Sequence, residues 1–105
     1  LQLHRPDEVA VEQLFFNRNV TSAMAVGEAR GIALLAAGQH DLPVAEYTPS
    51  RVKEALTGSG RATKQEVQLL VVMTLGLDRP PRPDDVSDAL AIALTHHFYR
   101  QLVPA

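Results

Sequence analysis

A chain of 105 residues with 46% hydrophobic and 21% charged residues has the size and composition of one soluble globular domain. Its formal net charge of -2 argues against a protein that coats nucleic acid by charge alone, since such domains are usually strongly basic. The lack of cysteine excludes a disulfide framework and a cysteine zinc site. No apolar run in the sequence is long enough to cross a bilayer, so we expect a cytoplasmic protein with no membrane association.

The first half of the chain predicts a strand, a helix and a second strand. Residues 7–16 are largely apolar, which is typical of a parallel strand covered on both faces. A helix follows from Asn19 or Thr21 to about residue 38, and residues 42–47 are predicted to form a short strand. The order strand, helix, strand favours a right-handed crossover between parallel strands.

The second half predicts three helices. Ser50 is predicted to cap a short helix that ends by residue 56. Thr63 and Glu66 form a capping box ahead of an apolar stripe, and Gly76 is placed to end that helix.

A proline-rich connection over residues 78–83 precedes a last helix, which starts at Asp84 or Asp85 and reaches about residue 99. Two strands do not usually form an independently stable sheet. We therefore interpret residues 1–105 as one α/β domain whose sheet is incomplete at the N-terminus.

Three carboxylates are candidates for metal chemistry. Glu12 lies near the carboxyl end of the first predicted strand, where open parallel sheets place their ligand sites. Asp85 and Asp88 are three residues apart, so on a helix they share one face and can reach the same ion. Position alone also fits structural roles, with Glu12 reaching solvent and the aspartates, Asp84 included, serving the first helical turn. Converging carboxylates suit Mg²⁺ better than Zn²⁺.

Four segments resemble, in order, the RuvC-type Holliday junction resolvases. They are residues 11–19 (VEQLFFNRN), 27–31 (GEARG), 58–60 (GSG) with Lys64, and 85–93 (DVSDALAIA). The resemblance implies an RNase H-like fold, a mixed sheet flanked by helices, in a symmetric homodimer. It also implies a Mg²⁺-dependent endonuclease, with Mn²⁺ as the alternative ion, that resolves four-way junctions in recombination and DNA repair.

The resemblance assigns roles to the three carboxylates. It makes Glu12, Asp85 and Asp88 the second, third and fourth catalytic, metal-binding carboxylates of the family. The first is an aspartate on the opening strand of the family's sheet, and this sequence starts beyond that strand. The chain as given is therefore expected to lack a full metal site.

DNA contacts are expected for four further residues, three of which the resemblance assigns. Lys53 and Lys64 match basic positions near the scissile phosphate and the backbone, and Arg61 assists by the same electrostatics. Phe15 matches an aromatic that contacts bases at the crossover. Lys64 also follows a glycine-rich loop at the start of a capped helix, where it adds charge to an anion site. The structural alternatives are solvated lysines and a core aromatic.

The helix over residues 19–38 carries Ala23, Gly27 and Gly31 at four-residue spacing. The resemblance places this helix at the homodimer interface, whereas the alternative is a helix that lies close on its own sheet. A branch-migration motor of the RuvA and RuvB type is the implied partner, alongside four-way junction DNA. Two other functions stay open: another RNase H-like nuclease, and a non-catalytic DNA-binding or dimerisation module.

Overall fold

The computed structural model describes residues 4–13 and 20–102 of the chain. In order, the elements are β1 (Val9–Glu12), α1 (Val20–Gln39), β2 (Val44–Tyr47), α2 (Pro49–Thr57), α3 (Lys64–Leu75) and α4 (Asp84–Leu102). They fall into two compact units, divided between Glu46 and Tyr47. Among the described helices, none combines the length and the apolar character that a membrane span requires.

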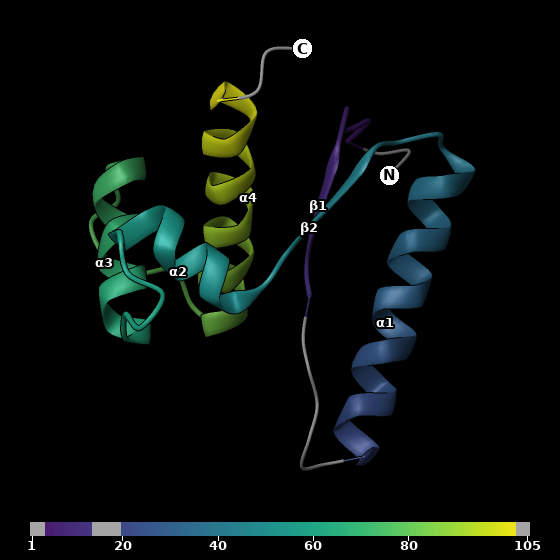
Figure 1. Cartoon of the computed structure of the whole chain (residues 1–105), viewed down its shortest axis with the longest axis horizontal. Helices are drawn as coiled ribbons and strands as arrows, with labels where there is room; N and C mark the ends of the chain where they lie inside the picture. The colour runs from purple at the N-terminus through teal and green to yellow at the C-terminus, as the bar shows by residue number, and fades with distance from the viewer. Residues whose placement is uncertain (1–3, 14–19, 103–105) are drawn as a thin grey trace. The chain divides into compact units, whose positions relative to one another are not determined.

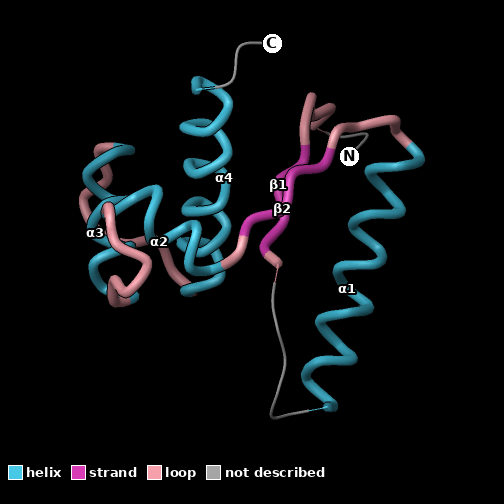
Figure 2. The backbone as a smooth tube through the Cα atoms, in the orientation of Figure 1, coloured by secondary structure: helices cyan, strands magenta, loops and turns pink. Residues whose placement is uncertain are grey.

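The first unit is a strand, a helix and a strand. β1 and β2 pair in a two-stranded sheet and run in the same direction, and α1 connects them (Figure 1, Figure 2). Just before β2, the Pro43 carbonyl accepts a hydrogen bond of 2.9 Å from the Val9 N–H. The predicted parallel pairing through a helical crossover is therefore confirmed. The part of the first predicted strand beyond residue 13 lies outside the described residues.

β2 starts later than predicted because residues 40–42 complete the end of α1. The His40 N–H donates to the Ala36 carbonyl at 3.2 Å, and the Leu42 N–H donates to the Ala37 carbonyl at 2.9 Å. Asp41 takes a left-handed conformation with φ 55°. These bonds satisfy carbonyls that the helix end would otherwise leave without partners.

The second unit packs α2, α3 and α4 around one apolar core. Val52 and Leu56 of α2, Val71 of α3 and Ala91 of α4 are its buried members. α4 turns small side chains toward this core at four-residue spacing, with Ser87 and Thr95 buried on either side of Ala91. The Thr95 hydroxyl donates to the Ala91 carbonyl at 2.8 Å, so this buried polar group is satisfied within its own helix. α4 is thereby held against both other helices.

α3 begins and ends where the sequence predicts. The Thr63 hydroxyl accepts a hydrogen bond from the Glu66 N–H at 3.2 Å and donates one to the Glu66 carboxylate at 3.2 Å. At the other end, Gly76 has φ 68°, and its N–H donates to the Val72 carbonyl. A left-handed glycine of this kind ends a helix at no steric cost.

The predicted cap of α2 is wrong by two residues. Thr48, not Ser50, accepts the hydrogen bond from the Arg51 N–H, at 3.1 Å. The reason is Pro49, which takes the first helical position, where its fixed φ suits the helix and its missing N–H is not needed. Ser50 therefore already lies inside the helix.

Candidate functional site

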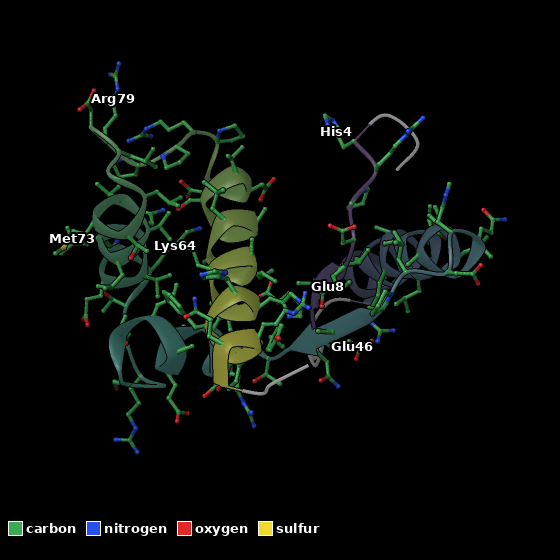
Figure 3. All side chains as sticks on the ribbon, turned by 90° about the horizontal axis from the view of Figure 1, so that it is seen from above. His4, Glu8, Glu46, Lys64, Met73 and Arg79 are labelled. Carbon is green, nitrogen blue, oxygen red and sulfur yellow. The ribbon has the colours of Figure 1, made fainter. Side chains whose placement is uncertain are left out.

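The first residues of α3 and α4 meet in the second unit. Lys64 opens α3 and Asp84 opens α4, and the Lys64 Nζ lies 3.1 Å from the Asp84 Oδ2. Both side chains are about half exposed, at 50% and 58%. Figure 3 shows Lys64 between the two helices. Asp84 lies in the first turn of its helix, as expected, and it is also the counterion of Lys64.

The charges at this point reinforce one another. The hydrogen bond to Asp84, and then the negative charge of Asp88, raise the pKa of the Lys64 ammonium above its ordinary value. The hydrogen bond and charge of Lys64 in turn lower the pKa of the Asp84 carboxyl. Asp85 also contributes to the field at Lys64. One cation thus lies within electrostatic reach of both predicted metal ligands of α4.

Asp85 and Asp88 are exposed and lie one helical turn apart at the start of α4. Hard carboxylate oxygens with this spacing fit a Mg²⁺ ion, which usually takes one or two carboxylates together with water and phosphate. Within the part of the chain that the structure describes, no three His, Cys, Asp or Glu side chains are gathered to hold a metal. That Asp85 and Asp88 hold a metal ion therefore stays a prediction.

Glu12 is the last residue of β1, in the first unit, and its side chain is partly buried. That it joins Asp85 and Asp88 around one ion stays a prediction. Phe15 lies outside the described residues, and so its contact with DNA bases stays a prediction as well.

The remaining predicted DNA contacts lie on α2 and on the loop that follows it. Lys53 is partly buried on α2, and Arg61 is exposed in the loop, where its N–H donates to the Ser59 hydroxyl at 3.2 Å. Gly58 has φ 87°, and a Cβ on Gly60 would lie 2.8 Å from the Ser50 Oγ. The loop between Arg61 and α2 is thus shaped by a left-handed turn and a close approach.

The small residues of α1 leave part of that helix open. A Cβ added at Gly27 or Gly31 would meet no atom of the described residues within 4 Å. Ile32 and Leu35, on neighbouring positions, are 69% and 61% exposed. The side chain of Ala23 lies outside the described part. Small and apolar residues therefore share a face of α1 that another backbone can approach closely.

The residue that sequence reasoning missed is Asp84 as the partner of Lys64. Helix-start rules consider only neighbours along the chain, and they correctly place an acidic residue in the first turn of α4. The ion pair depends instead on the packing of α3 against α4. The only signal in the sequence is that a lysine and an aspartate each begin a helix, and that the two helices are expected in the same domain.

Comparisons with known proteins agree along most of the chain. Residues 1–96 match the family model described as crossover junction endodeoxyribonuclease RuvC. The chain is 55% identical over 96 residues to the protein of that name from Desulforamulus reducens, a match that covers 91% of this chain and 59% of that protein. The protein of the same name from Desulfitobacterium hafniense is 60% identical over 92 residues, covering 88% of this chain and 56% of the relative.

Two solved structures are also similar. Thermus thermophilus RuvC matches with a TM-score of 0.85 and 51% identity, over 93% of this chain and 59% of that one. T. thermophilus RuvC in complex with a Holliday junction substrate matches with a TM-score of 0.89 and 50% identity, over 96% and 61%. The predicted RNase H-like fold is confirmed by these matches. The chain spans less than two thirds of the length of these relatives.

Proposed function

The chain belongs to the crossover junction endodeoxyribonuclease RuvC family, and we propose that the whole protein resolves four-way DNA junctions by metal-dependent phosphodiester hydrolysis in recombination and repair. One observation carries the proposal: the family match runs over residues 1–96 and includes every segment with a predicted site residue. The relative solved with a Holliday junction substrate supports the choice of DNA substrate.

Asp85 and Asp88 are proposed to hold Mg²⁺, with Mn²⁺ as the alternative, together with Glu12 and an aspartate outside this sequence. Their place on α4 supports this role, because the buried side of that helix is fixed against α2 and α3 while the aspartates stay exposed. When bound there, Mg²⁺ would activate water and stabilise the leaving oxygen. The carboxylates contribute by fixing ligand positions at the end of a rigid element.

Lys64, Lys53 and Arg61 are proposed to bind backbone phosphates. Lys64 is the best supported of the three, because its ammonium lies beside Asp84, the residue that precedes Asp85 on α4. Phe15 is proposed to stack on a base at the crossover, which would help distinguish a junction from continuous duplex.

A homodimer through α1 is part of the proposal, since paired cleavage needs two sites related by symmetry. The open face with Gly27, Gly31, Ile32 and Leu35 supports the assignment. A branch-migration motor of the RuvA and RuvB type is the proposed partner of the complex on the junction.

The test compares two substrates for the whole protein: a four-way junction and a linear duplex with the sequence of one pair of arms. With Mg²⁺, we expect symmetric paired nicks in the junction and little cleavage of the duplex, and with a chelator no cleavage of either. Equal cleavage of both substrates would favour another RNase H-like nuclease. Binding of the junction with no cleavage under any metal would favour a non-catalytic module.

A further inference from the structure

The proposed function assigns Lys64 to a phosphate of the DNA, but in this structure Lys64 is already paired with Asp84. The Lys64 Nζ is 3.1 Å from the Asp84 Oδ2, which is within the range of a charge-assisted hydrogen bond. The two residues belong to the same compact unit, and each opens its helix. Lys64 is thus neutralised by a carboxylate of its own chain before any phosphate arrives.

A phosphate at Lys64 meets two kinds of negative charge. Asp85 and Asp88 are predicted to hold metal, so bound cations would neutralise them when the protein is loaded. Asp84 has a different position, because its carboxylate is already directed to the Lys64 ammonium. A phosphate that approaches this ammonium is therefore repelled by Asp84 until the ion pair opens.

We propose that Asp84 competes with the DNA backbone for Lys64, so that a phosphate must displace the Asp84 carboxylate to gain this contact. The inference rests on the proposed function, since it takes Lys64 as a phosphate ligand. Exposure of both side chains makes the displacement easy, because exposed ion pairs are weak and open at little cost. Asp84 thus weakens DNA binding without preventing it.

The test is a double-mutant cycle on junction binding by the whole protein, with a chelator present to keep metal from bridging carboxylate and phosphate. Asp84→Asn should tighten binding by about two- to fivefold, the upper part of the range that exposed ion pairs typically span. In the Lys64→Ala background, the same substitution should change affinity by less than about 1.5-fold. The dependence on Lys64 is the signature of competition.

The matched control is Asp78→Asn, which removes the same charge from the connection between α3 and α4. It measures the gain that comes from lower net charge alone. Equal gains from Asp84→Asn with and without Lys64 would overturn the competition, and so would no gain at all. If Lys64→Ala itself left junction affinity unchanged, the proposed phosphate contact would fail instead, so the two failures are distinguishable.

Discussion

The Tyr47 hydroxyl lies 2.6 Å from the His96 Nδ1, and both residues belong to the second unit. Tyr47 also stacks on Tyr99, with ring centroids 5.6 Å apart, and the Arg51 guanidinium lies 5.7 Å from the Tyr99 centroid.

Tyr47→Phe should lower the free energy of unfolding by about 1 kcal/mol, because it removes a partly buried hydrogen bond and keeps the ring. Urea unfolding measures the change. Tyr99→Phe is the control, and an equal loss there would contradict the role of the Tyr47 hydroxyl.

The same residue predicts a loss of stability at alkaline pH. Burial, and then the charge of Tyr99, raise the pKa of the Tyr47 phenol above its ordinary value of 10.0. A group whose pKa is higher in the folded state contributes fully below its unfolded pKa, and the contribution is lost as pH rises through the folded pKa. Stability should therefore fall above about pH 10, and less so in Tyr47→Phe. Identical pH profiles for the two proteins would contradict this assignment.

Two apolar residues of α3 should respond differently to truncation. Val71 is fully buried in the core, whereas Met73 is 67% exposed. Val71→Ala should lower the free energy of unfolding by roughly 2 kcal/mol, since it leaves a cavity that the packed helices cannot fully close. Met73→Ala should change it by less than about 0.5 kcal/mol. Urea unfolding measures both changes, and the midpoints can be compared if the two variants share the same dependence of unfolding free energy on urea. Equal losses in the two variants would contradict the burial of Val71 in the core.

Local signals in the sequence predict the elements well and their contacts poorly. Thr63 and Gly76 are correct as the two ends of α3 because capping depends on residues within one or two turns. Ser50 is wrong as a cap because a better arrangement, Thr48 followed by Pro49, lies two residues earlier. Both outcomes follow from rules that act along the chain.

No local pattern in the sequence predicts the contacts between helices and strands. The hydrogen bond between Tyr47 and His96 and the ion pair between Lys64 and Asp84 each join residues that only tertiary packing brings together. The predicted carboxylates were found by resemblance and spacing, and the structure supports Asp85 and Asp88 as exposed residues one turn apart. That Glu12 joins them around one ion stays a prediction, because no local pattern in the sequence determines how residues far apart in the chain are brought together.

If α1 forms the dimer interface, a larger side chain on its small-residue face should weaken the dimer. Gly31→Leu should weaken association of the whole protein, because the added side chain fills space that the partner backbone would occupy. Gln39→Leu adds the same side chain at the last residue of α1 and should leave the dimer intact. Sedimentation over a concentration series reports the two dissociation constants. An unchanged dimer in Gly31→Leu would remove α1 from the interface.

Mg²⁺-dependent junction cleavage at saturating protein tests the proposal that Glu12, Asp85 and Asp88 are ligands of a catalytic metal. In the whole protein, Glu12→Gln, Asp85→Asn and Asp88→Asn should each reduce cleavage by more than about a hundredfold, beyond the loss usual for outer-shell residues. Junction binding should persist, since it rests on basic residues and shape. Asp78→Asn should cleave normally. Full cleavage by all three carboxylate variants would contradict the metal site.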